Sequence, residues 1–153
     1  MKSFKVEWTI VQQHMVKINM DFESEFNLAM SYKNKGDYET ALSIMLKILE
    51  FKEDAPLLWV TGMILRELGR FSDAVEIFRK ATLLDPTAKK PSLGLFHSLW
   101  DSGREDEAIY EMNRFLSVST CEDYKAIRAE LNEYEDLPKQ SRSGSRQTMQ
   151  GDE

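Results

Sequence analysis

The sequence is poor in the residues that build metal centres and disulfide-stabilised domains. Its 153 residues include one cysteine, Cys121, and two histidines, His14 and His97. A single cysteine excludes an internal disulfide, and none of these residues has a partner at the spacing of a zinc motif. We therefore expect no bound metal, and we interpret Cys121 as a spectator near a helix start.

Basic residues are fewer than acidic residues. Lys and Arg number 20 against 26 Asp and Glu, for a formal net charge of −6. Nucleic acids and anionic membranes are bound through clustered basic residues, whereas the basic residues here are scattered. The chain lacks a signal-peptide core and any apolar run of membrane-spanning length. We expect a cytoplasmic protein that binds neither nucleic acid nor membrane.

Catalytic motifs are missing as well. The sequence has no glycine-rich phosphate loop, no nucleophile elbow and no Cys–His pair. Its carboxylates are plentiful, but the acidic run at 105–107 opens a predicted helix, where negative charge interacts favourably with the helix dipole. We predict that the protein is not an enzyme and uses no cofactor.

A repeated signature is what the sequence does contain. A glycine followed five residues later by an alanine occurs at 36–41, 69–74 and 103–108, so the glycines lie 33 and then 34 residues apart. A fixed period of this length indicates stacked helical hairpins, because one hairpin cannot bury its apolar face alone. Just past a helix end, glycine can adopt the left-handed conformation that closes a turn. We therefore place the three glycines in the hairpin turns.

The segments on both sides of each glycine have helical periodicity. After the first glycine, Ala41, Ile44, Met45 and Ile48 follow the three-and-four spacing of one buried helix face. Similar spacing follows the other two glycines and recurs after the third repeat, where an open stack needs a capping helix. The predicted organisation is an N-terminal segment (1–21), three repeats within 22–122 (22–54, 55–88 and 89–122), a capping helix (122–136) and a disordered tail (137–153).

The N-terminal segment has two competing patterns. Alternate residues from 4 to 10 are apolar, as in a strand, whereas Val11, Met15 and Ile18 are spaced as in a helix. We favour an amphipathic helix that covers the first repeat. A short strand or a loosely held arm is the alternative.

These residues resemble the tetratricopeptide repeat family, whose unit of about 34 residues combines small residues, aromatics, a turn glycine and a closing proline. In the third repeat, Phe96 departs from the pattern, because a small residue there would let the paired helices approach closely. The resemblance implies an all-α, right-handed superhelix of three helix-turn-helix repeats with a C-terminal capping helix. The middle repeat fits best, through Gly62, Gly69, Phe71, Ala74, Phe78, Ala81 and Pro86.

The resemblance also implies a binding surface, because the first helix of every repeat in this family lines a concave groove. Aromatic, Met and Arg residues dominate the transferred positions, and such residues recur at interface hot spots. The alternative is that Trp59 and Trp100 pack the core. The predicted groove residues are Phe26, Met30, Lys33, Asn34, Trp59, Met63, Arg66, Glu67, Leu93, His97, Trp100 and Asp101.

The chemistry of these positions constrains the ligand. Family members that clamp the C-terminal carboxylate of heat-shock chaperones have Lys, Asn and Arg where this chain has residues such as Phe26, Trp59 and Met63. A carboxylate clamp is therefore not expected. An apolar or amphipathic peptide suits the predicted groove better.

We predict a non-catalytic protein-interaction module, an adaptor or chaperone-like protein, with an apolar groove rimmed by Lys33, Arg66 and Asp101. Its layout is similar to that of the small bacterial tetratricopeptide chaperones that hold secreted translocator proteins. Two alternatives remain open. One is a structural or assembly subunit that self-associates, for example as a homodimer, and the other is a stoichiometric inhibitor such as an immunity protein.

Overall fold

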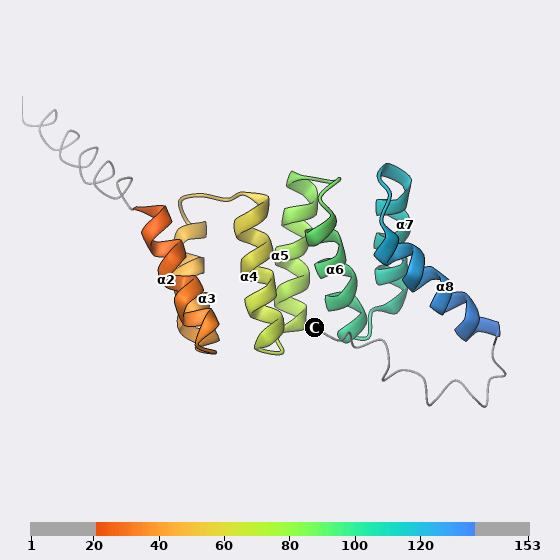
Figure 1. The fold of residues 1–153 in the computed structure, drawn as a ribbon, viewed down its shortest axis with the longest axis horizontal. Coiled ribbons are helices and arrows are strands. Elements are labelled where there is room, and N and C mark those ends of the chain that lie inside the picture. Colours follow the sequence, from red (N-terminus) through yellow and green to blue (C-terminus); the bar gives the residue numbers. More distant parts are fainter. Residues whose placement is uncertain (1–20, 137–153) are drawn as a thin grey trace, which may run out of the picture.

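The computed structural model describes residues 21–136, with side chains as far as residue 133. In this range the chain forms seven α-helices and no strand, so the predicted all-α class is confirmed. The helices form three hairpins and a last single helix, in a row from α2 to α8 (Figure 1). The predicted N-terminal helix and disordered tail lie outside the described residues, apart from Asp21. The helices are α2 (Phe22–Asn34), α3 (Tyr38–Leu49), α4 (Ala55–Glu67), α5 (Phe71–Leu84), α6 (Lys89–Asp101), α7 (Glu105–Val118) and α8 (Glu122–Asp136).

The same hydrogen-bonded turn ends the first helix of each hairpin. Gly69 has a φ of 70°, its N–H donates to the carbonyl of Arg66 at 2.8 Å, and the N–H of Arg70 donates to the carbonyl of Leu65 at 2.9 Å. Equivalent bonds close the turns at Gly36 and Gly103. An L side chain is strained at this positive φ, and the pair of bonds satisfies carbonyls that the helix end leaves free. The predicted turn role of the glycines is confirmed.

The hairpins stack in two layers. α2, α4 and α6, the first helices, lie in front of α3, α5 and α7 (Figure 1). Each second helix packs on its own partner and on the first helix of the next hairpin, so that α5 contacts both α4 and α6. We call the exposed side of α2, α4 and α6 the inner face.

One ring fills the junction between the second and third hairpins. Phe78 of α5 is fully buried, and a Cβ built on Gly62 of α4 or Gly94 of α6 would lie 2.6 Å or 2.5 Å from its ring. α4 and α6 can therefore approach α5 this closely only because both positions lack a side chain.

Phe96 has a different role from the one its alignment suggested. Its side chain is 3% exposed, and its ring lies 5.6 Å from the ring of Tyr124 in α8. The repeat pattern did not indicate this contact of the ring with the capping helix. The ring packs the end of the stack.

A buried polar network anchors α8. The Ser92 hydroxyl of α6 donates to a Glu111 carboxylate oxygen at 2.6 Å and lies 2.9 Å from the Tyr124 hydroxyl. Arg114 makes two hydrogen bonds to the same carboxylate, at 2.6 and 2.7 Å. Burial raises the pKa of Tyr124, so its phenol stays protonated. The buried charge of Glu111 is thus paired and hydrogen-bonded, as its burial requires.

Candidate functional site

The groove residues predicted from the sequence all lie on the first helices of the three hairpins. Asn34 and Glu67 are exposed, and the other members are half-buried. Half-burial is what a side chain has when one side packs on the core and the other faces a surface hollow. The structure brings Phe26 and Trp59 together at one pocket, and it gathers Arg66, His97, Trp100 and Asp101 in a separate closed corner.

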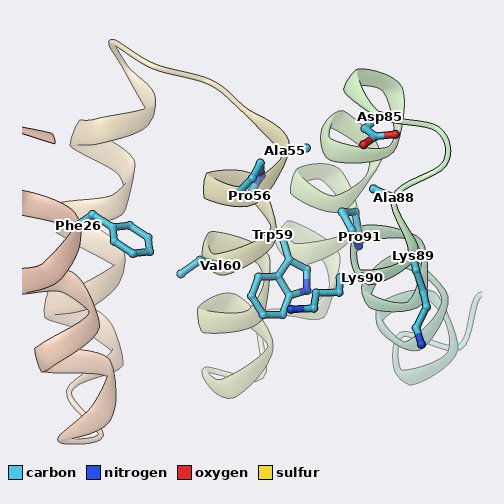
Figure 2. Close-up of a pocket in the computed structure, with 10 residues that line it drawn as sticks. All are labelled: Phe26, Ala55, Pro56, Trp59, Val60, Asp85, Ala88, Lys89, Lys90 and Pro91. Atoms are coloured by element: carbon cyan, nitrogen blue, oxygen red, sulfur yellow. The ribbon is translucent and has the colours of Figure 1, made fainter. Parts of the chain in front are cut away.

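The pocket has a volume of about 600 Å³ and lies on the inner face between α2, α4 and the start of α6 (Figure 2). Phe26 points from α2 toward α4, and Trp59 projects from α4 beside the first turn of α6. Most of the lining is apolar, which favours an apolar ligand group. We call this the Trp59 pocket; its lining residues are Phe26, Ala55, Pro56, Trp59, Val60, Asp85, Ala88, Lys89, Lys90 and Pro91.

Lys90 places a positive charge against the indole. Its Nζ lies 4.7 Å from the centroid of the Trp59 ring, within the range of a cation–π interaction (Figure 2). No carboxylate of residues 21–133 pairs with this ammonium group. The first turn of α6 contains no acidic residue, and its N-cap, Ala88, has no side chain that could bond the free N–H groups. The α6 side of the pocket is therefore electropositive.

The other two charged residues at this pocket interact with other side chains or with the backbone. Lys89 forms an ion pair with Asp123 of α8 at 2.7 Å, and this hydrogen bond holds the pKa of Asp123 below its ordinary value. The Asp85 carboxylate accepts hydrogen bonds from the backbone N–H and the hydroxyl of Thr87, at 3.1 and 2.9 Å. Lys90 is thus the cation that a ligand would meet.

The corner at the other end of α4 and α6 is closed by an ion pair. The Arg66 guanidinium donates to the Asp101 carboxylate at 2.9 Å, and the two side chains are 25% and 15% exposed. Trp100 stacks on Phe96 with ring centroids 5.8 Å apart and planes 20° from parallel. We call these four residues with His97 the Arg66–Asp101 corner. Its charges neutralise each other across the two helices.

His97 adds a titratable group to this corner. Its imidazole is half-buried and meets the Phe96 ring edge-on at 5.3 Å. Burial, and then the positive charge of Arg66, lower the pKa of His97 from its ordinary 6.5, while Asp101 and Asp123 act in the opposite direction. The imidazole is therefore neutral at pH 7.

The structure revises the predicted rim. Arg66 and Asp101 bind each other, so neither presents a free charge to a ligand. Lys33 makes no ion pair within the described part of the chain, and Met30 and Met63 pack partly against the core. None of these five residues lines the Trp59 pocket.

Sequence reasoning missed Pro56, Val60 and Lys90, which join Phe26 and Trp59 in the pocket. The pocket residues in the first turns of α4 and α6 are not among the groove positions transferred from the repeat family. One signal could have pointed to Lys90, because a basic residue in a helical first turn without acidic neighbours opposes the helix dipole. A residue that does not stabilise its own helix is a candidate for a contact outside that helix.

A second hollow lies on the opposite layer. It has a volume of about 320 Å³ and is lined by residues of α5, α6 and α7, among them Leu83 and Tyr110. These two side chains are 80% and 71% exposed. The sequence analysis did not identify this outer surface.

Within 21–136, no three His, Cys, Asp or Glu side chains gather in a way that could hold a metal ion. None of the helices in that range has both the length and the apolar character needed to span a bilayer.

Residues 23–54 and 55–87 match the family model of the tetratricopeptide repeat. The chain carries tetratricopeptide repeats. The predicted family is confirmed on the first two hairpins, and the third hairpin continues their geometry with the same glycine turn. A comparison with curated proteins found no match.

Solved tetratricopeptide-type structures share the fold. A MamA R50E mutant is 22% identical over 67% of this chain and 75% of its own, with a TM-score of 0.60. MamA from AMB-1 is 20% identical over 74% of this chain and 64% of its own, also with a TM-score of 0.60. The Yersinia enterocolitica type III secretion chaperone SycD, in complex with a peptide of the translocator YopD, is 15% identical over 72% of this chain and 86% of its own, with a TM-score of 0.61. The fold is an all-α superhelix of the tetratricopeptide type.

Proposed function

We propose that this tetratricopeptide repeat protein is a non-catalytic interaction module that holds a peptide segment of a partner protein on its inner face. The observation that supports this most is the Trp59 pocket, an apolar hollow of about 600 Å³ to which all three hairpins contribute. A pocket of this size accommodates one or two large side chains.

The mode of binding follows from the shape of the surface. Apolar grooves between helices bind amphipathic helices or extended segments through a few anchor side chains. Half-buried Trp and Met residues suit this task, since they provide large contact areas and adaptable shapes. The likeness to SycD, a chaperone solved with a translocator peptide, supports the same class of ligand.

The experiment that tests the proposal is affinity capture with the full chain and three variants. Trp59→Ala should lose the captured protein while its helical circular dichroism is retained. Trp100→Ala should mainly lower stability, because its indole stacks on buried Phe96. Tyr110→Ala is the matched control, since it removes an exposed aromatic from the outer layer.

The outcomes separate the groove from the core. Capture that survives Trp59→Ala, or that is lost equally in Tyr110→Ala, contradicts a binding site on the inner face. Loss of helicity in Trp59→Ala would show that this indole belongs to the core. In that case a milder change at the pocket, Val60→Thr, tests the same surface without removing an aromatic ring.

One observation favours a second function, self-association. Leu83 and Tyr110 expose apolar surface beside the outer hollow, and such surface marks many protein contacts. Light scattering after size exclusion should then show a concentration-dependent dimer that Leu83→Lys abolishes. A monomer at all concentrations would remove this candidate and leave the inner-face proposal unaffected.

A further inference from the structure

Lys90 places one cation directly against the indole of the Trp59 pocket. Its Nζ lies 4.7 Å from the centroid of the Trp59 ring and pairs with no carboxylate of residues 21–133. The neighbouring Lys89 is neutralised by Asp123 at 2.7 Å, and the Asp85 carboxylate, which accepts two hydrogen bonds from Thr87, lies farther from the indole than Lys90 does (Figure 2). A ligand group bound against the indole therefore meets the charge of Lys90 first.

Such a cation favours a ligand of opposite charge. A group bound against the indole would displace water from around Lys90, and an ammonium group that loses water is stabilised by a nearby carboxylate. A neutral ligand would leave this cost uncompensated, and a basic one would add repulsion. Charge complementarity thus selects an acidic partner segment.

The N-terminal segment of this chain is a poor candidate for the pocket. Residues 1–20 contain several large apolar side chains, but they carry Lys2, Lys5 and Lys17 against the single acidic residue Glu7. Their positive charge would repel Lys90. Residues 137–153 are also net basic, with Lys139, Arg142 and Arg146 against Asp152 and Glu153, so we take the occupant to belong to another protein.

We propose that the Trp59 pocket binds a large apolar side chain of an internal partner segment, with an Asp or Glu of that segment, within one helical turn, paired to Lys90. This inference rests on the proposed peptide-binding function and specifies its ligand. We place the acid in a side chain and not at a chain terminus, and a peptide with a free C-terminal carboxylate tests this choice.

The test uses the full chain and synthetic helical peptides, acetylated and amidated so that they have no terminal charge. Each has one central Leu and, four residues later, Glu, Gln or Lys. Fluorescence anisotropy should show that the Glu peptide binds on the order of fivefold more tightly than the Gln peptide, and that the Lys peptide binds most weakly. Added NaCl should reduce these differences.

Variants assign the preference to a single residue. Lys90→Gln should make the Glu and Gln peptides bind equally, and Lys90→Glu should reverse the order so that the Lys peptide binds best. Lys47→Glu is the matched control, because Lys47 is an exposed lysine of the outer helix α3 and its change alters net charge equally. It should leave the order unchanged.

Three results would overturn the inference, and they differ in what else they affect. Equal binding of the three peptides with a loss of binding in Trp59→Ala would end the acidic preference and leave the proposed function standing. Absence of binding by all peptides would remove both. Tighter binding of a peptide that lacks Glu but has a free C-terminal carboxylate would assign Lys90 to chain termini instead.

Discussion

The two ends of the inner face differ, although the same repeat pattern predicted both as groove. At the Arg66–Asp101 corner, opposite charges on α4 and α6 lie 2.9 Å apart, and Trp100 stacks on a buried ring. At the Trp59 pocket, a hollow of about 600 Å³ lies beside Lys90, which pairs with no carboxylate among residues 21–133. A repeat position therefore selects which side chains face inward, but their neighbours decide whether that surface is free to bind.

The close contact of α4 and α6 depends on Phe78, and removing this ring should have the largest effect. Phe78→Ala deletes a fully buried side chain between Gly62 and Gly94. We expect the free energy of unfolding to fall by about 3–5 kcal/mol. Urea denaturation followed by circular dichroism measures this.

Gly94→Ala serves as the partner change. In the wild type it should destabilise by about 1–2 kcal/mol, because the clash with Phe78 outweighs a gain in helix propensity of roughly 1 kcal/mol. In the Phe78→Ala background the same change should become neutral or stabilising. A stabilising Gly94→Ala in the wild type would show that the contact is not tight.

The ion pair at the corner should have the next largest effect. Asp101→Asn leaves the partly buried Arg66 guanidinium without its counter-charge, and Arg66 Nε already has no hydrogen-bond partner within the described residues. We expect a loss of about 1–2 kcal/mol, since both side chains are mostly buried. Thermal denaturation should show this loss, and Asp73→Asn, at an exposed ion pair of α5, is the control that should change stability far less.

The corner should also respond to pH, with a smaller effect. The pKa of His97 lies below its unfolded value of 6.5, mainly through burial, so the unfolded chain takes up this proton first as the pH falls. The stabilisation is complete above about pH 6.5 and is lost as the pH falls through the folded pKa. Denaturation curves at about pH 7.5 and about pH 5.5 should converge in His97→Gln, and an unchanged pH dependence in this variant would contradict the assignment.

At the pocket, the smallest effect should be a gain in stability. Lys90→Glu places a negative charge in the first turn of α6, which contains no acidic residue, and should stabilise by about 0.3–1 kcal/mol. Lys47→Glu makes the opposite change, in the last turn of α3, and should destabilise by a similar amount. If Lys90→Glu instead lowers stability, the contact of its ammonium with Trp59 contributes more than the helix dipole.

The fold was open to prediction because it depends on local signals. Each hairpin turn needs a residue that tolerates a positive φ. Glycine occurs at every one of these turns and at a regular interval, as Gly36, Gly69 and Gly103. The helices between them follow from apolar spacing. The contact of Phe96 with Tyr124 was not open to prediction in the same way, because it joins α6 to the capping helix across 28 positions of the chain.

The candidate site was only partly open to prediction. Phe26 and Trp59 came from the repeat pattern, and the structure brings them to one pocket. Lys90 was not predicted from the repeat pattern, because its role depends on the distance of its ammonium group from a ring 31 positions earlier in the chain. The pairing of Arg66 with Asp101 likewise joins two different repeats.

The sequence by itself determined the number of hairpins in residues 22–122 and the position of their turns, because these depend on backbone conformation and on contacts three or four residues apart. Only the tertiary structure decided which inward residues remain available. That choice depends on distances between side chains of different repeats, where a few ångströms separate a neutralised ion pair from a free charge beside an open pocket.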